Sequence, residues 1–311
     1  MNSKILIVDD LHPVFKEKAM ELGYEVDDQP LISRAETLSV ISQYTGIAVR
    51  TKFRIDQELM DAAPNLRFVA RAGAGLDNID EAYASAKGIL LINAPEGNRD
   101  AVGEHATGML LSLMNNFQKA DAEIRQGTWD REGNRGWELK GKTVGIIGYG
   151  FMGQSFAKKL SGFEVNVIAY DKYKTGFSDA YAREVSMEEI VKQSDVLSLH
   201  IPLTSETRQM VNDEYFFHFK KPFFFINTAR GEIVSTSSVL KAIENKKIIA
   251  AGLDVLETEK FPALAQQDWY QSLVASGKVL LTPHVGGWTF DSYRKISEVL
   301  AQKLEELRLG H

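Results

Sequence analysis

Short apolar runs alternate with amphipathic stretches along the chain of 311 residues. Unbroken apolar runs of about four to eight residues are typical of strands buried in a parallel sheet, whereas apolar positions at every third or fourth residue predict helices. In the first third of the chain, this pattern predicts strands at residues 5–8, 24–26, 46–49, 66–70 and 89–92. Helices are predicted between them at residues 14–22, 33–43, 56–62 and 80–86, with Ser33 as the cap of the second helix.

The same alternation continues in the second part of the chain. A segment at residues 94–98, which contains Pro and Gly, is interpreted as a linker between two domains, and a long helix is predicted at residues 101–126. After a loop at residues 127–141, strands are predicted at residues 143–147, 165–170, 196–200, 223–227, 248–254 and 279–282. Helices are predicted at residues 151–160, 187–192, 213–219, 235–245 and 291–309. We therefore expect an α/β protein with parallel sheets that are covered by helices on both faces.

Residues 142–153 form the stretch around which the second part is organised, because an apolar strand there ends in glycines spaced G-x-G-x-x-G. Gly148 permits a tight turn, Gly150 lets the backbone approach a pyrophosphate, and Gly153 lets the next helix pack close to the sheet. The N–H groups and the positive dipole end of that helix, which starts near Phe151 and Met152, then face the phosphates. This arrangement predicts a dinucleotide-binding site.

Asp171 follows the next predicted strand, about twenty residues beyond the glycines, where a carboxylate is placed to bind the ribose hydroxyls of adenosine. A carboxylate at this position also repels a 2′-phosphate, so Asp171 favours NAD over NADP. Lys172 and Lys174 follow closely and leave the strictness of this preference open.

Candidate catalytic side chains follow three of the later predicted strands. This position is informative because ligands of open α/β sheets bind at the carboxyl ends of the strands. Arg230, Glu259 and His284 supply a guanidinium, a carboxylate and an imidazole. His284 can donate a proton to a carbonyl oxygen, Glu259 can stabilise the imidazolium, and Arg230 can bind a substrate carboxylate with two hydrogen bonds. Each residue alone has an ordinary structural explanation, but together they fit the reduction of a 2-oxo acid.

The composition excludes several classes of function. The formal net charge is −6 at pH 7 and basic residues are scattered among acidic ones, so no nucleic-acid partner is expected. The absence of cysteine excludes disulfides and thiolate metal sites, and no metal site is expected. The N-terminal residues lack the apolar region of a signal peptide, and the longest apolar helical stretch, near residues 109–114, is too short to cross a bilayer. We therefore expect a cytoplasmic protein without membrane contact.

The first predicted strand ends at Asp9 and Asp10, which resemble the paired acids that hold magnesium in phosphorelay receiver domains. Such a site also needs an aspartate at the end of the third strand, and Arg50 stands there instead. We therefore interpret Asp9 and Asp10 as solvated residues at a strand end.

Over nearly its whole length the chain resembles the D-isomer-specific 2-hydroxyacid dehydrogenase family, in particular its short phosphoglycerate dehydrogenase-like members. The motifs that carry the resemblance are residues 71–80, 148–153, 200–204, 227–231, 252–255 with Glu259, and 282–287. The resemblance implies a flavodoxin-like substrate domain at residues 1–97 and 288–311 and a Rossmann NAD-binding domain at residues 98–287, with a cleft between them. It also implies a homodimer formed through the cofactor domains.

The resemblance assigns roles to individual residues. Arg230, Glu259 and His284 are implied to be catalytic. The implied contacts with NAD are Gly148, Gly150, Phe151, Met152, Gly153, Asp171, His200, Pro202, Thr204, Thr228, Ala229, Asp254 and Gly286. The implied contacts with the substrate are Arg50, Gly73, Ala74, Gly75 and Asn98.

The chain departs from the family pattern in two places. Lys260 follows Glu259 where the family usually has proline, so Glu257 stays an alternative to Glu259. Asp100 and Ala101 replace a residue that is often basic and a serine, which leaves recognition of a phosphate open. No appended regulatory domain is expected after the last helix.

We expect an NAD-dependent D-2-hydroxyacid dehydrogenase, with 3-phosphoglycerate as the first substrate to test and serine biosynthesis as the implied pathway. Arg50, Lys52 and Arg54 supply charge for a phosphate, or form a solvated strand end. The alternatives are a hydroxypyruvate or glyoxylate reductase and, from another class, an NADH-sensing protein similar to corepressors of this fold.

Overall fold

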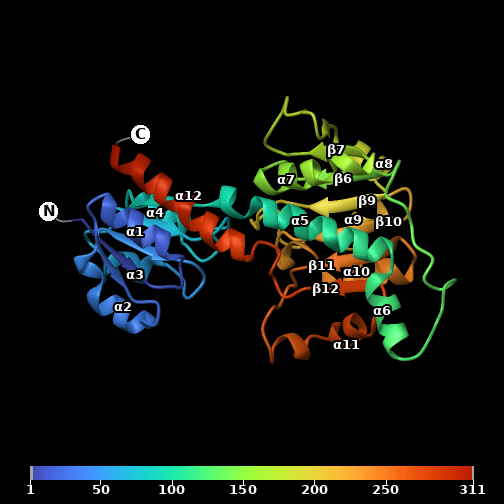
Figure 1. Ribbon diagram of the computed structural model, residues 1–311, viewed down its shortest axis with the longest axis horizontal. Coiled ribbons are helices and arrows are strands. Elements are labelled where there is room, and N and C mark those ends of the chain that lie inside the picture. The colour runs from blue at the N-terminus through green and yellow to red at the C-terminus, as the bar shows by residue number, and fades with distance from the viewer. Residues whose placement is uncertain (1–2, 310–311) are drawn as a thin grey trace. The chain divides into compact units, whose positions relative to one another are not determined.

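The computed structural model describes residues 3–309 and divides into two compact units (Figure 1). One unit comprises Met1–Asn98 and Trp288–His311, and the other comprises Arg99–Gly287. Residues 1, 2, 310 and 311 lie outside the described part, and the first two belong to the N-terminal segment for which no signal peptide is predicted. Within residues 3–309, none of the helices is both long and apolar enough to cross a membrane.

The first unit is a five-stranded parallel sheet in the order β2-β1-β3-β4-β5, which is the flavodoxin-like order. Its strands are β1 (Lys4–Ile7), β2 (Glu25–Asp28), β3 (Gly46–Val49), β4 (Phe68–Arg71) and β5 (Leu90–Asn93). The helices are α1 (Pro13–Glu21), α2 (Arg34–Val40), α3 (Gln57–Asp61), α4 (Glu81–Ala86) and α12 (Phe290–Leu309), with a short 3₁₀ turn at Ile41–Gln43. The C-terminal helix α12 belongs to this unit because Ile296, Leu300 and Leu304 pack into one core with Phe15 of α1 and Ile5 of β1.

The second unit is a seven-stranded parallel sheet in the order β12-β11-β10-β9-β6-β7-β8. Its strands are β6 (Thr143–Ile147), β7 (Asn166–Tyr170), β8 (Arg183–Glu184), β9 (Val196–Leu199), β10 (Phe223–Asn227), β11 (Ile248–Leu253) and β12 (Val279–Leu281). The helices are α6 (Phe117–Arg125), α7 (Phe151–Lys159), α8 (Met187–Gln193), α9 (Asp213–Phe217), α10 (Thr236–Glu244) and α11 (Tyr270–Ala275), with 3₁₀ turns at Leu160–Phe163, Gly231–Ile233 and Leu264–Gln266. The prediction of two parallel-sheet α/β domains is confirmed.

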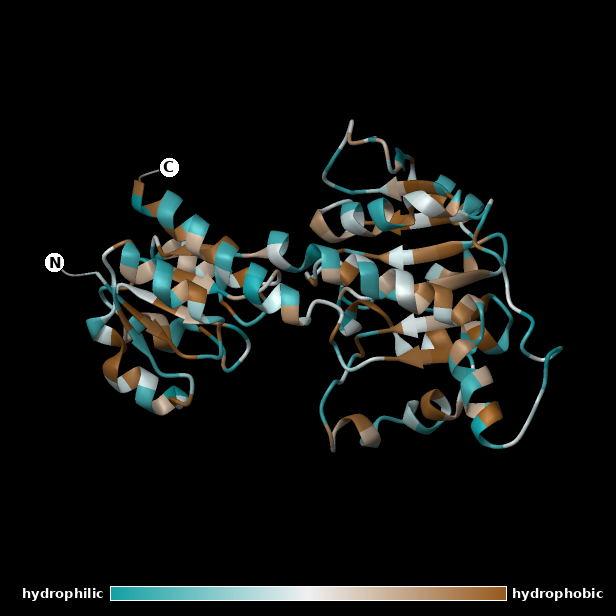
Figure 2. Ribbon diagram, in the orientation of Figure 1, coloured by the Kyte–Doolittle hydropathy of each residue, from teal (hydrophilic) through white to brown (hydrophobic). Residues whose placement is uncertain are grey.

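The strands of the larger sheet are strongly hydrophobic, as expected for strands with helices on both faces (Figure 2). β6 pairs with β7 on one side and with β9 on the other, so the strand order reverses at β6. Ligands of open α/β sheets bind at such a switch point, outside the carboxyl ends of the strands. The glycine-rich turn directly follows β6 and therefore lies at this point.

The boundary between the two units falls after Asn98, at the end of the segment interpreted as a linker, although most of this segment is helical, because α5 (Pro95–Met114) begins at Pro95, a residue suited to the first helical turn. One prediction about the middle of the chain is wrong. The long helix predicted at residues 101–126 is broken after Met114, since Asn116 has a left-handed backbone with φ of 54° and α6 starts at Phe117. The short strand β8 and helix α11 were not predicted at all.

Candidate active site

The glycine-rich turn after β6 requires glycine at two of its three positions. Gly148 has a φ of 90°, and a Cβ there would lie 2.5 Å from the carbonyl oxygen of His200. At Gly153, a Cβ would lie 2.1 Å from the carbonyl oxygen of Gly148. A Cβ at Gly150 would meet no heavy atom within 4 Å, so the chain itself does not demand glycine at that position. The open space at Gly150 is what a closely approaching pyrophosphate requires.

Helix α7 starts directly after Gly150 and has no side-chain hydrogen bond at its N-cap. The N–H groups of its first turn, which include those of Phe151 and Met152, have no partner inside the helix. Together with the positive end of the helix dipole, they form a site that suits the phosphates of a dinucleotide.

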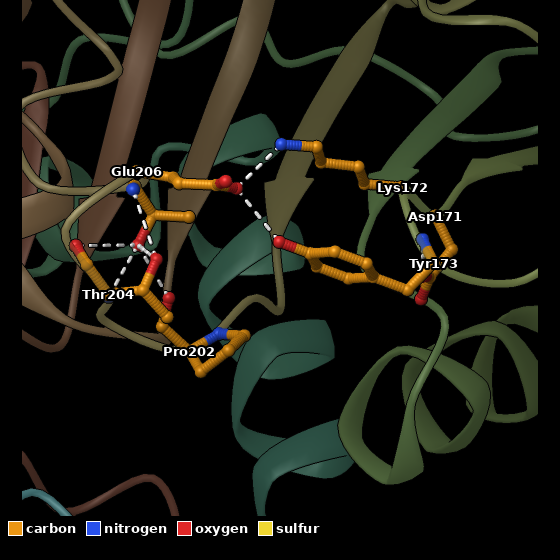
Figure 3. A network of polar contacts seen from close by, with 7 residues as sticks. Asp171, Lys172, Tyr173, Pro202, Thr204 and Glu206 are labelled. Carbon is orange, nitrogen blue, oxygen red and sulfur yellow. Dashed lines mark hydrogen bonds and ion pairs between the residues drawn. The ribbon is translucent and has the colours of Figure 1, made fainter.

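Asp171 follows β7 and lies beside this turn. Its carboxylate accepts hydrogen bonds from the backbone N–H of Tyr149 at 2.9 Å and of Tyr173 at 3.0 Å. Pro202 and Thr204 lie in the loop after β9 (Figure 3). Thr207 stabilises this loop, because its hydroxyl donates to the carbonyl of Pro202 at 2.7 Å. The two loops flank β6, as expected for the walls of an adenosine site.

The imidazole of His200, a predicted cofactor contact, is directed into the protein. Its Nε2 lies 2.9 Å from the hydroxyl of Ser198, and burial lowers the pKa of His200 to about 3. The ring packs beside Phe156 of α7, with 5.4 Å between the ring centroids. The neutral side chain therefore supports the helix behind the glycine-rich turn, and the carbonyl of His200 is the group that closely approaches Gly148.

Asp254, directly after β11, is the centre of a buried hydrogen-bond network. Its carboxylate accepts hydrogen bonds from the Thr282 hydroxyl at 2.6 Å and from the N–H groups of Val285 and Gly286 at 2.9 Å each. His105 Nε2 lies 3.4 Å from the same carboxylate. Burial acts to raise the pKa of Asp254, but the hydrogen bonds from these groups outweigh it and lower the pKa. Asp254 is therefore held as a carboxylate that fixes the loop around Gly286.

His105 and Thr282 were not assigned roles from the sequence. His105 Nε2 and the Thr282 hydroxyl are 3.0 Å apart, although the residues are separated by 177 positions. The one signal in the sequence was that Thr282 belongs to the motif at residues 282–287. No sequence pattern indicated that His105 contacts Thr282.

The loop after β10 contributes Thr228, Ala229 and Arg230. Asn227 shapes this loop, because its side chain accepts from the N–H of Ala229 at 3.0 Å and donates to the carbonyl of Arg230 at 3.1 Å. The hydroxyl oxygen of Thr228 is buried without a hydrogen-bond partner in the described chain. A buried polar group without a partner is costly, so this hydroxyl is suited to a bound ligand. With the space at Gly150 and the uncapped helix α7, it shows that these residues fit a dinucleotide.

His284 and Glu259 form the candidate acid–base pair. His284 follows β12 and has a left-handed backbone with φ of 54°, held by a hydrogen bond from its N–H to the carbonyl of Asp254 at 2.8 Å. Its Nδ1 lies 2.9 Å from Glu259 Oε2. The hydrogen bond with Glu259 raises the pKa of His284 above its ordinary value of 6.5, although burial and the charge of Arg230 act to lower it.

Glu257, the alternative to Glu259, is engaged elsewhere. Its carboxylate accepts from the side-chain amide of Gln209 at 2.8 Å and from the backbone N–H of Thr236 at 2.7 Å, at the start of α10. Glu257 therefore stabilises the N-terminus of a helix, and Glu259 is the carboxylate that contacts the imidazole.

Arg230 follows β10, the neighbour of β11 in the sheet, and β12 is next to β11. A Cβ at the next residue, Gly231, would lie 1.9 Å from the carbonyl of Leu256, so the loops after β10 and β11 are in direct contact. Arg230 Nη1 donates to the carbonyl of Ala229 at 2.6 Å. The positive charge of Arg230 acts to lower the pKa of His284.

The candidate substrate residues Arg50, Gly73, Ala74, Gly75 and Asn98 belong to the first unit. Arg50 follows β3, and its Cζ lies 4.0 Å from the ring centroid of Trp288, a stacked arrangement. Gly73 has a φ of 146° in the loop after β4, and its carbonyl accepts from the N–H of Ala94 at 2.8 Å. Asn98 lies in the first turns of α5, where its Oδ1 is buried without a partner in the described chain.

The interpretation of Asp9 as a solvated residue is wrong, since only 8% of it is exposed. Its Oδ2 accepts hydrogen bonds from three consecutive backbone N–H groups, those of Arg50 at 3.0 Å, Thr51 at 2.7 Å and Lys52 at 2.9 Å. Asp9 therefore fixes the loop that carries Arg50, whereas Asp10 is exposed as predicted.

Comparisons with known proteins show the family to which the chain is similar. The model of the D-isomer specific 2-hydroxyacid dehydrogenase NAD binding domain matches residues 107–286. The chain is 32% identical over 309 residues to the D-3-phosphoglycerate dehydrogenase of Archaeoglobus fulgidus, a match that covers 99% of this chain and 58% of that protein. It is 33% identical over 273 residues to the hydroxypyruvate reductase of Thermotoga maritima, with 88% of each chain covered.

Among solved structures, the D-lactate dehydrogenase from Aquifex aeolicus complexed with NAD and lactic acid matches with a TM-score of 0.83 at 26% identity. That match covers 99% of this chain and 96% of the other. The chain therefore belongs to the D-isomer specific 2-hydroxyacid dehydrogenase family, a family of NAD-dependent oxidoreductases. NAD is its cofactor.

Proposed function

We propose that the protein interconverts a small D-2-hydroxy acid and its 2-oxo acid, with His284 and Glu259 as the acid–base pair and Arg230 as the ligand of the substrate carboxylate. The observation that carries this proposal is the 2.9 Å contact between His284 Nδ1 and Glu259 Oε2, on strand ends of the same sheet as the dinucleotide turn.

The cofactor, when bound as NADH, supplies a hydride to the carbonyl carbon of the 2-oxo acid. His284 uses Nδ1 for Glu259, so its Nε2 is the atom that donates a proton to the carbonyl oxygen. The raised pKa of His284 keeps more of the imidazole protonated near neutral pH, which favours this step. Arg230 binds and orients the carboxylate, and in the oxidative direction neutral His284 accepts the hydroxyl proton.

In the first unit, we propose that the backbone at Gly73, Ala74 and Gly75 binds the substrate carboxylate and that Arg50 and Asn98 also contact the substrate. This makes the first unit the substrate domain and the second the NAD-binding domain, although Arg230 of the second unit also contacts the substrate. Support comes from their positions: Arg50 follows β3, residues 73–75 follow β4 within the motif at residues 71–80, and Asn98 lies at the start of α5.

The proposed substrate is 3-phosphoglycerate, which implies a role in serine biosynthesis, and the relative from Archaeoglobus fulgidus favours it. A second candidate, a hydroxypyruvate or glyoxylate reductase, is favoured because Lys52 and the backbone amides of its loop already have hydrogen-bond partners. Lys52 Nζ donates to the carbonyl of Pro30 at 2.6 Å, and the loop amides already bind Asp9. This loop therefore offers a phosphate fewer donors than its sequence suggests.

We also propose a cytoplasmic homodimer formed through the second unit. Four large apolar side chains on α6 and in the following loop support self-association, because each is at least half exposed. They are Phe117, Ile124, Trp129 and Trp137. The measurement is the mass of the protein in solution, and a monomer would contradict this assembly.

The function is tested by NADH oxidation with purified protein against phosphohydroxypyruvate, hydroxypyruvate, glyoxylate and pyruvate. Preference for phosphohydroxypyruvate supports the phosphoglycerate dehydrogenase, and preference for an unphosphorylated acid supports the reductase. Tight NADH binding without turnover of any of these acids would contradict the proposal and favour an NADH-sensing protein.

A further inference from the structure

A polar bridge joins the two strand ends that flank β6 beside the glycine-rich turn (Figure 3). Lys172 Nζ lies 2.6 Å from Glu206 Oε2, and the Tyr173 hydroxyl donates to the same oxygen at 2.8 Å. Lys172 and Tyr173 follow β7, whereas Glu206 lies in the loop after β9. Because β7 and β9 are the two neighbours of β6, the bridge lies at the switch point of the sheet.

The bridge determines which charges are available beside Asp171. A lysine at this position would normally attract the 2′-phosphate that distinguishes NADP from NAD. Here Glu206 binds Lys172, while Lys174 Nζ donates to the carbonyl of Tyr149 at 3.0 Å. The contact raises the pKa of Lys172 and lowers that of Glu206, so both groups are charged at neutral pH. Glu206 thus offsets the charge of Lys172, the residue that follows Asp171.

We propose that Glu206 determines cofactor specificity: it engages the ammonium of Lys172, so that this cation does not offset the repulsion between Asp171 and a 2′-phosphate. The inference rests on the proposed binding of the adenosine ribose beside Asp171. Glu206 acts through Lys172 and is therefore a positioning residue rather than a catalytic one. It makes the preference for NAD stricter than Asp171 alone would make it.

The size of the effect is limited by solvent. The side chains of Lys172 and Glu206 are 57% and 55% exposed, and exposed ion pairs are weak and screened by salt. We therefore expect a change of about fivefold in relative affinity at low ionic strength, which decreases as salt is added.

The experiment is a fluorescence titration of the full chain with NADH and with NADPH, in the absence of any 2-oxo acid. Glu206→Gln removes the charge but keeps a polar side chain of similar size. We expect the ratio of the NADPH and NADH dissociation constants to fall by about fivefold at low salt and by much less in about 0.5 M NaCl. In the double variant with Lys172→Ala and Glu206→Gln, the ratio should return toward the wild-type value. The lysine that Glu206→Gln releases is the group that improves NADPH binding, and the double variant lacks it.

Glu164→Gln is the matched control, because Glu164 forms an ion pair with Lys140 at 2.9 Å that is also more than half exposed. It precedes β7 and so lies at the opposite end of the strand from Asp171. The control should leave the ratio unchanged.

The proposal would be overturned if Glu206→Gln left the ratio of dissociation constants unchanged. It would also be overturned if the fall in this ratio did not depend on salt, or if it persisted after Lys172→Ala was added. Wild-type protein that binds NADPH as tightly as NADH would also overturn it. Because no 2-oxo acid is present, a failure of the proposed substrate chemistry leaves this result interpretable.

Discussion

His284 Nδ1 lies 2.9 Å from Glu259 Oε2, although the two residues are 25 positions apart and follow different strands. This contact fixes the orientation of the imidazole and leaves Nε2 for the substrate. It also identifies Glu259, rather than Glu257, as the carboxylate beside the imidazole, although Lys260 follows it.

His284→Ala is expected to lower turnover of the preferred 2-oxo acid at least about a hundredfold, because it removes the proposed general acid. Binding of NADH, measured by fluorescence titration, should stay close to that of the wild type. His218→Ala is the control, since His218 is exposed at the C-terminal end of α9 and precedes β10, whereas Arg230 follows that strand. Near-normal turnover by His284→Ala would remove His284 from the mechanism.

Glu259→Gln is expected to shift the pH dependence of kcat/KM to lower pH. Glu259 raises the pKa of His284, and the reductive reaction needs the protonated imidazole, so wild-type reduction should decline as pH rises through a pKa above 6.5. Without the carboxylate the pKa falls, and the decline begins at lower pH. The oxidative reaction, which needs neutral His284, should gain activity at lower pH for the same reason.

Glu257→Gln is the control for Glu259→Gln. Glu257 binds the N-terminus of α10 and Gln209, not His284, so its substitution should leave the pH profile in place. If Glu257→Gln moved the profile and Glu259→Gln did not, the assignment of the pair would be reversed.

Gly150→Ala and Gly153→Ala are expected to fail in different ways. A Cβ at Gly150 meets nothing within 4 Å, so Ala should change the free energy of unfolding by less than about 0.5 kcal/mol but weaken NADH binding by about tenfold or more. At Gly153, a Cβ would lie 2.1 Å from the carbonyl of Gly148, so Ala should destabilise the unit by about 1–3 kcal/mol.

Urea unfolding and NADH titration of each glycine variant separate the two effects. Gly162→Ala is the control, because its Cβ also meets nothing within 4 Å and Gly162 lies beyond the far end of α7. Unimpaired NADH binding by Gly150→Ala would show that no phosphate lies against this turn.

Asp9→Ala is expected to destabilise the protein by about 2–4 kcal/mol, because it leaves three partly buried N–H groups without their charged acceptor. Urea unfolding measures this change. Asp10→Asn should cost less than about 0.5 kcal/mol, because Asp10 is exposed and Asn still accepts from the Tyr293 hydroxyl. Equal stability of the two variants would contradict the role assigned to Asp9.

The strands were the most predictable part of the fold. β3, β6 and β10 have the predicted bounds, because each is an apolar run that ends sharply at polar residues or glycine. The break between α5 and α6 was missed because both helices continue the same apolar periodicity, and only the left-handed backbone of Asn116 separates them.

The site was predictable from the sequence only where its residues form a recognisable pattern within a short stretch. The glycine spacing and Asp171 follow from the requirements of a dinucleotide and can be read from a short stretch. By contrast, Glu257 and Glu259 follow the same strand, and only the packing of the later loop shows which one meets His284. The contact between His105 and Thr282 likewise depends on tertiary structure, as does the burial of Asp9 under residues 50–52.

The way in which Asp9 holds its loop has a consequence for the evolution of substrate range. Asp9 binds the backbone of residues 50–52 and none of their side chains. Exchange of Thr51 or Lys52 therefore leaves the loop shape intact while it changes the groups that the loop displays. If Arg50 contacts the substrate as proposed, substrate preference would be open to stepwise change, and to redesign, by substitutions at residues 51 and 52 that leave the contacts of Asp9 in place.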